Sequence, residues 1–161
     1  MFTRCLRADF YKMKRSSVII AHIIIPIVVS AVFLAYYAIS GWNETDKIIA
    51  FYETLGSAFP VLIGIFIAST MEQEQNAGAF QNLLTLRSKT AALFSKVVTL
   101  LVFGLFALLF TAVIFGFGFN MIHGHSIASM GLFVRAVLVM WLSAISLYLC
   151  LLYTSPSPRD A

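Results

Sequence analysis

The chain contains four blocks of apolar residues, each long enough to cross a lipid bilayer. A helix needs about 20 apolar residues to span roughly 30 Å of hydrocarbon. The blocks are residues 17–39, 51–70, 97–119 and 130–152, and the second and fourth contain one charged residue each, Glu53 and Arg135. Because the blocks are apolar throughout rather than alternating with polar residues, helices are favoured over the strands of a membrane barrel. We therefore predict an all-α, polytopic transmembrane bundle with four visible spans.

Composition excludes an ordinary soluble domain. Of the 161 residues, 60% are hydrophobic and 11% are charged, whereas soluble domains have about 25% charged residues. The first block resembles a secretory signal in its basic flank, but a signal core has only about 7 to 15 apolar residues. We therefore expect block 17–39 to be a retained helix.

Basic residues are distributed unequally among the connecting segments. Eight of the 11 Lys and Arg residues lie before the first block or between the second and third, whereas the first connection has only Lys47 and the third has none. Short segments rich in Lys and Arg stay in the cytoplasm. We therefore place the N-terminus and residues 72–96 in the cytoplasm. Cys5 falls on this reducing side, so no disulfide is expected.

The N-terminal segment has the pattern of an amphipathic helix. Phe2, Leu6, Phe10 and Met13 recur at helical spacing, and basic residues occupy much of the remaining surface. This pattern predicts a short helix in the cytoplasmic interface. The alternative is a basic tail that only sets the orientation. In both cases the charges are expected to contact anionic lipid, not nucleic acid.

The polar stretch between the second and third blocks has a helical pattern of its own. The second span is predicted to continue through Gln75 and to end near Gly78. Phe80, Leu83 and Leu84 then follow at helical spacing and form a small apolar face. Such a face either docks a soluble partner or lies on the membrane surface.

The same stretch carries a resemblance to a transporter family. The residues concerned are Glu72, Glu74, Gly78, Phe80, Gln81, Asn82, Leu83 and Leu84, followed by Lys96. Their order resembles the cytoplasmic loop of ABC-2 type permeases, and more narrowly that of lantibiotic immunity permeases. The N-terminal segment and the residues around Pro60 are similar to the same family, so the resemblance covers residues 1–120.

The resemblance implies a function in peptide export. In that family, two permease subunits pair with a separate ATPase and move a lanthionine-containing antimicrobial peptide away from the producer's membrane. It implies a bacterial cytoplasmic membrane, an ABC ATPase and a second permease subunit as partners, and contact between residues 72–90 and the ATPase. Two other functions stay open: an ABC-2 permease for drugs or another hydrophobic substrate, and a membrane scaffold protein without transport activity.

The C-terminal residues 150–161 change abruptly from apolar helix to a Pro and Ser tail. The run CLLYTSPSPRD resembles a translated sequencing-library adapter, and the alternative is a natural linker with two Ser-Pro pairs. We expect this tail to be non-native and residues 1–149 to be a partial transmembrane domain. Because permeases of the family typically have six spans, the resemblance implies that two are missing.

No residues suited to catalysis, to a cofactor or to a metal stand out. The sequence has no G-x-x-x-x-G-K-[ST] loop for phosphate, so ATP hydrolysis is expected in the partner. His123 and His125 are too few for a zinc site, which normally takes three or four protein ligands, and they favour a polar outer loop. His22 is expected to make an interhelical hydrogen bond. Glu53 and Arg135 are expected to extend toward the membrane surface.

One stripe of small residues runs along the second block. Its members are Gly56, Pro60, Gly64 and Ala68, at intervals of four. Side chains this small let helices approach closely, so the stripe predicts either helix packing or a subunit interface. Pro60 also removes one helical hydrogen bond and permits a bend at membrane depth.

Overall fold

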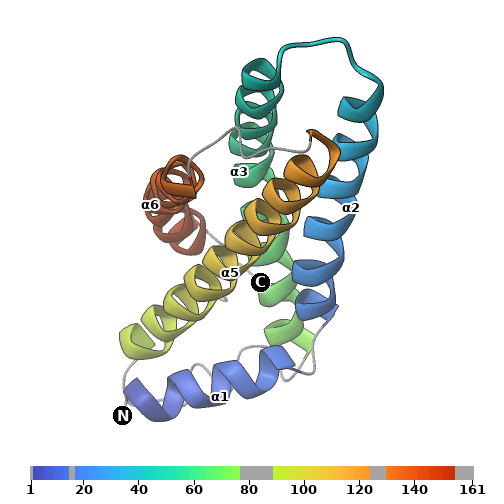
Figure 1. The fold of residues 1–161 in the computed structure, drawn as a ribbon. Coiled ribbons are helices and arrows are strands. Elements are labelled where there is room, and N and C mark those ends of the chain that lie inside the picture. The colour runs from blue at the N-terminus through green and yellow to red at the C-terminus, as the bar shows by residue number, and fades with distance from the viewer. Residues whose placement is uncertain (1, 15–16, 77–88, 124–129, 155–161) are drawn as a thin grey trace.

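The computed structural model describes residues 2–14, 17–76, 89–123 and 130–154, nearly all of them helical (Figure 1). The helices are α1 (Phe2–Lys14), α2 (Ser17–Ile39), α3 (Glu44–Asn76), α5 (Lys89–His123) and α6 (Met130–Thr154). No strand occurs within these ranges. The prediction of an all-α bundle is confirmed.

Four of the helices are long and apolar enough to cross a membrane, namely α2, α3, α5 and α6. The bounds of α2 are those predicted from the first apolar block. α3 and α5 are longer than the predicted spans, with 33 and 35 residues. At 1.5 Å per residue each is roughly 50 Å long, which exceeds the hydrocarbon thickness. Both helices therefore have turns outside the hydrocarbon.

The short turn between α2 and α3 explains why one helix ends and the other begins there. The Ser40 amide donates to the Tyr36 carbonyl at 3.1 Å and so closes the last turn of α2. The Lys47 amide donates to the Asn43 carbonyl at 3.1 Å, which places Asn43 at the N-cap of α3. Asn is a preferred N-cap residue, and acidic residues in a first turn, here Glu44 and Asp46, complement the helix dipole.

α5 is the central helix of the bundle. It packs against α1, α2 and α6, while α3 packs against α6 and α2. Figure 1 shows α5 crossing obliquely between its neighbours and α1 lying across one end of the bundle. The apolar face of α1 therefore covers protein: Met13 is buried, and Leu6 and Phe10 are partly buried.

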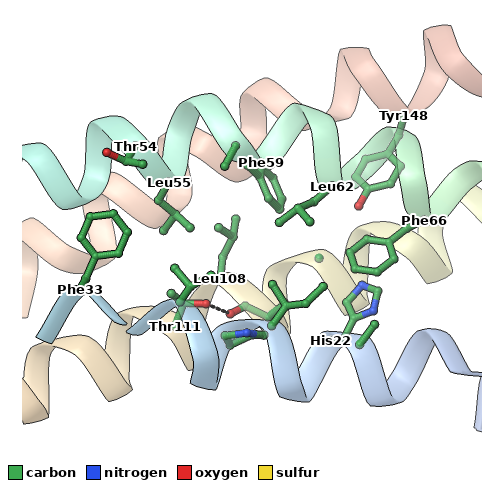
Figure 2. A pocket seen from close by; sticks show the side chains of 17 residues that line it. His22, Phe33, Thr54, Leu55, Phe59, Leu62, Phe66, Leu108, Thr111 and Tyr148 are labelled. Carbon is green, nitrogen blue, oxygen red and sulfur yellow. Dashed lines mark hydrogen bonds between the residues drawn. The ribbon is translucent and has the colours of Figure 1, made fainter. Parts of the chain in front are cut away.

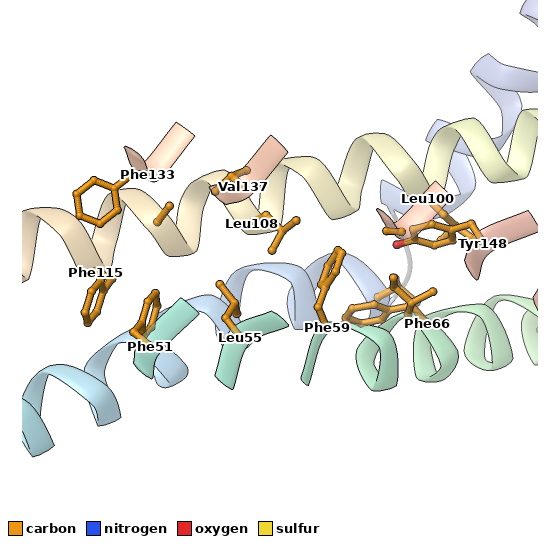
Figure 3. Close-up of a cluster of buried hydrophobic side chains, with 14 of the residues drawn as sticks. Phe51, Leu55, Phe59, Phe66, Leu100, Leu108, Phe115, Phe133, Val137 and Tyr148 are labelled. Carbon is orange, nitrogen blue, oxygen red and sulfur yellow. The ribbon is translucent and has the colours of Figure 1, made fainter. Parts of the chain in front are cut away.

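Aromatic side chains form the core between α3 and α5. Phe51 of α3 stacks on Phe115 of α5, with ring centroids 3.6 Å apart and planes within 4°. Phe33 of α2 meets Phe51 edge-on, with centroids 5.3 Å apart. Figure 3 shows large α3 side chains from Phe51 to Phe66 directed at α5. α3 and α5 thus meet through large side chains, and their backbones stay apart.

Two polar bonds fix α5 against α2 and α6. The indole N–H of Trp141 in α6 donates to the Leu101 carbonyl of α5 at 2.9 Å. The Ser30 hydroxyl of α2 donates to the Thr111 carbonyl of α5 at 3.4 Å. Bonds of this kind contribute to helix association in membranes, where lipid is as apolar as the helix surfaces.

Candidate functional site

The segment predicted to contact the ATPase, residues 72–90, includes the end of α3 and the beginning of α5, and it is called the coupling segment below. Glu72 is exposed near the end of α3, and Glu74 belongs to the same helix. α3 continues to Asn76, so the predicted extension of the second span past Met71 is confirmed. The other predicted residues of the segment lie outside the described ranges; they are Gly78, Phe80, Gln81, Asn82, Leu83 and Leu84.

α1 is hydrogen-bonded to α5 near the N-terminal end of α5, which follows the coupling segment in the chain. The Ser95 hydroxyl of α5 donates to the Asp9 carboxylate of α1 at 2.5 Å, and Ser95 is fully buried. The ring of Phe10 lies 5.4 Å from that of Phe103. A hydrogen bond to an ionised carboxylate is stronger than one between neutral groups. A displacement of the first turns of α5 would therefore carry α1 with it.

A buried lysine joins α2 and α3 at the opposite end of the bundle. Lys47, in the first turn of α3, is 5% exposed, and its ammonium donates to the Tyr37 carbonyl at 2.9 Å. Tyr37 belongs to the last turn of α2, where carbonyls have no partner within the helix. Lys47 thus caps α2 from α3 and fixes the angle of the turn between them.

An apolar cavity of about 200 Å³ lies between α2, α3 and α5. Phe66, Leu62, Phe59 and Leu55 are among its α3 walls, and Tyr148 of α6 closes one side. Figure 2 shows His22, Phe66 and Tyr148 at one end of the cavity and Phe33, Thr54 and Leu55 at the other. The polar groups on its walls are His22, Thr54, Thr111 and Tyr148.

His22 corrects one sequence prediction. We expected an interhelical hydrogen bond, but Nδ1 bonds the Val18 carbonyl of its own helix at 2.7 Å. The interhelical contact is stacking instead, because the imidazole lies on the Phe66 ring with centroids 4.0 Å apart. Nε2 is buried and has no hydrogen-bond partner among the described residues. The prediction was wrong because the carbonyl four residues earlier in the same helix lies within reach of the imidazole.

The stripe of small residues lies largely on the outside of the described bundle. Pro60 and Ala68 are exposed, and Gly56 and Gly64 are half-buried. A methyl group added at Gly64 would meet no atom within 4 Å, and one added at Gly56 would meet only the Met140 sulfur, at 3.7 Å. α3 continues through Pro60 as one helix. Packing of this stripe against another subunit stays a prediction.

A family model described as ABC-2 family transporter protein matches residues 5–157. The match runs from α1 to the end of α6. The chain belongs to this family. No curated protein and no solved structure matches it.

Family membership gives the ABC-2 protein its broad role. It is a multi-pass membrane protein and the permease subunit of an ABC transporter, and this subunit is not itself catalytic. Membership also implies an ABC ATPase as a partner. Both the match and α6 reach into residues 150–161, and the foreign origin of that tail stays a prediction.

The two charged residues inside the predicted spans lie at the surface of the ABC-2 permease, and His123 is half-buried. Glu53 and Arg135 are exposed on the bundle. His123 bonds the Phe119 carbonyl of its own helix at 3.1 Å, and His125 lies outside the described ranges. Within those ranges, no group of three potential metal-ligating side chains occurs.

Sequence reasoning missed the buried polar contacts of the permease. Lys47 counted only as an outer-loop charge, although a lysine just after a short turn can reach the carboxyl end of the preceding helix. The contact of Ser95 could not be predicted from the sequence, because a polar residue near the end of a membrane helix is ordinary. The position of Tyr148 could not be predicted either, because only the packing of α6 brings this residue to the cavity.

Proposed function

We propose that this ABC-2 permease subunit acts with an ABC ATPase and a second permease subunit to expel a lantibiotic-type antimicrobial peptide. The site of action would be the cytoplasmic membrane of a bacterium. The resemblance of residues 72–96 to lantibiotic immunity permeases supports the choice of cargo. ATP binding and hydrolysis in the partner would drive alternating rearrangement of the two permease subunits.

The observation that carries the proposal is the attachment of the coupling segment to the central helix. In the chain, residues 77–88 stand between α3 and α5, and α5 packs against α1, α2 and α6. Each of the two helices is roughly 50 Å long. A displacement of one end along the helix axis would therefore also move the other end. A displacement applied at this segment would therefore reach every helix that contacts α5.

ATPase docking is tested on the apolar residues of the coupling segment. Replacing Phe80 and Leu83 together by Asp should abolish co-purification of the ATPase, because burying two carboxylates in an apolar contact without partners is costly. Asn76→Asp is the control, since Asn76 is exposed at the end of α3 and its replacement adds charge without removing apolar surface. Retention of the ATPase by the double variant would refute docking through this face.

The cargo is tested by protection of a sensitive bacterial host. The full-length permease, expressed with its ATPase, should raise the inhibitory concentration of a lanthionine peptide several-fold. An amphipathic peptide without lanthionine rings and a set of hydrophobic drugs serve as comparison compounds. Protection against the drugs alone would replace peptide export by drug export, and failure to recover any P-loop ATPase would favour a scaffold.

A further inference from the structure

Two opposite charges lie on the outside of the bundle within its apolar spans, one on α3 and one on the neighbouring helix α6. The apolar blocks of α2 and α5 contain no charged residue, whereas those of α3 and α6 contain Glu53 and Arg135. Both side chains are exposed, and neither has a hydrogen bond or an ion pair within the part of the chain that the structure describes. A charge among lipid chains is costly, and such residues usually face another protein group or water.

Contacts with neighbouring helices place Glu53 well inside the spans. Phe51, two residues before it, stacks on Phe115 of α5 and meets Phe33 of α2 edge-on. Because α2 ends six residues after Phe33, at Ile39, Glu53 lies roughly 10 Å below that end. α2 is about as long as the hydrocarbon is thick. Glutamate lacks the long stem with which Lys and Arg extend to the membrane surface, so its carboxylate needs a partner at this depth.

Arg135 lies at nearly the same depth as Glu53. The ring of Tyr52, which precedes Glu53 in α3, lies 5.7 Å from the ring of Phe133, two residues before Arg135 in α6. The backbones at the two charged positions therefore differ in depth by no more than about one helical turn. The two side chains nevertheless form no ion pair within one copy of the chain.

Equal depth is the condition for pairing between two copies of a membrane protein. Two copies in the same orientation are related by a two-fold axis along the membrane normal, and this axis keeps every residue at its own depth. Across such an interface, residue i contacts residue j and j contacts i. Glu53 and Arg135 have opposite charges at one depth, so a single interface would form two ion pairs.

The side of α3 that carries Glu53 permits the close approach of another helix. Ser57, Pro60 and Gly64 follow Glu53 by four, seven and eleven residues, so they lie on the same side. Ser57 and Pro60 are exposed, and a methyl group added at Gly64 would meet no atom within 4 Å. Small side chains let helix backbones come close in a membrane. The short side chain of Glu53 can then reach a charge on the second copy.

We infer that Glu53 on α3 and Arg135 on α6 join two copies of this chain, each residue pairing with the opposite charge of the other copy. The inference deepens the proposed function and rests on one part of it, the presence of a second permease subunit, which it identifies as another copy of the same chain. It requires neither the ATPase nor a particular cargo.

Reciprocal charge reversal tests the pairing. Two copies of the full chain with different affinity tags are expressed together, extracted in mild detergent, isolated through one tag and probed for the other. Glu53→Arg in both copies, or Arg135→Glu in both, opposes like charges at both contacts and should reduce recovery by at least roughly tenfold. Glu53→Arg in one copy with Arg135→Glu in the other restores two opposite pairs, so recovery should return to the parent level.

Ser143→Glu is the matched control for this rescue. Ser143 is exposed on α6 but lies eight residues beyond Arg135, about 12 Å further along the helix. A copy with Ser143→Glu should therefore not recover one with Glu53→Arg. Undiminished self-association of both single variants would show that the charges face lipid. Failure of the reciprocal pair to associate would show that they face something other than a second copy, and either result overturns the inference.

Photo-cross-linking tests the contact without reversing a charge. Benzoylphenylalanine replaces Glu53 in one copy only, and the other copy is the parent chain labelled with heavy isotopes, so one native pair remains. Cross-links between the two copies should join position 53 to residues 131–139 of the heavy copy. Cross-links to lipid alone, or only within the light copy, would contradict the inference.

The inference and the proposed export function fail separately. Loss of peptide protection in cells would leave association and cross-linking unchanged. Protection that persists without rescue by the reciprocal pair would instead leave export in place with a different permease as the second subunit.

Discussion

At the scale of single residues, Lys47 makes the contact with the clearest consequence. Its ammonium is buried and holds the Tyr37 carbonyl at the end of α2. Lys47→Met keeps most of the packing but removes the charge-assisted bond and leaves that carbonyl without its partner. We expect a loss of about 1 to 3 kcal/mol in stability. Thermal unfolding in nanodiscs, followed by the loss of monodisperse protein, measures this effect.

Thr45→Ala is the control for Lys47→Met, because Thr45 is an exposed residue in the same turn of α3. It should unfold within a degree or two of the parent protein, as exposed substitutions usually change stability by less than about 0.5 kcal/mol. Equal midpoints for Lys47→Met and the parent protein would show that the bond contributes nothing to the turn.

At the scale of elements, the attachment of α1 to α5 is the contact to test. Ser95→Ala removes the hydroxyl that donates to Asp9 and leaves α5 otherwise intact. We expect faster amide hydrogen exchange throughout Phe2–Lys14, by up to roughly a hundredfold, since losing a bond to a charged group costs about 1.5 to 3 kcal/mol. Mass spectrometry of the exchanged peptides measures this rate.

Ser143→Ala is the matched serine control, because Ser143 is exposed and donates only to the Val139 carbonyl of its own helix. It should leave exchange in α1 unchanged. Exchange in α6 should be unaffected by Ser95→Ala, because the main contacts of α6 are with α5 and α3 and not with α1. If α1 exchanges at the same rate with and without the Ser95 hydroxyl, α1 is not fastened in this way.

At the scale of the whole molecule, the orientation in the membrane stays a prediction from the distribution of Lys and Arg. Single cysteines at Asn43, in the α2–α3 turn, and at Asn76, at the end of α3, test it on a background lacking Cys5 and Cys150. A maleimide that does not cross membranes should label intact cells at position 43 only. After permeabilisation it should label both positions. The reverse pattern would place the N-terminus outside.

The candidate site was predictable only in part. The acidic end of α3 and the continuation of that helix toward Asn76 followed from the helical pattern. His22 was recognised as a polar residue inside a span, but its partner was assigned wrongly. Hydropathy places a residue at a depth in the membrane, and it does not say which neighbour faces that residue.

The helices of this ABC-2 permease follow from its amino-acid sequence alone. Inside a bilayer no water is available to the backbone, so each long apolar block must satisfy its own hydrogen bonds as a helix. The agreement between the first block and α2, residues 17–39, follows from that requirement.

Which helix faces meet could be seen only in the packed bundle. Ile20 and Val32 of α2 are exposed although they are as apolar as the buried Val18. Lipid solvates apolar side chains as well as a protein core does, so hydrophobicity cannot select the buried face. The choice rests on shape and on a few polar bonds, such as Ser95 to Asp9 and Trp141 to Leu101. The cavity at His22 exists for the same reason, because it is the space that this packing leaves unfilled.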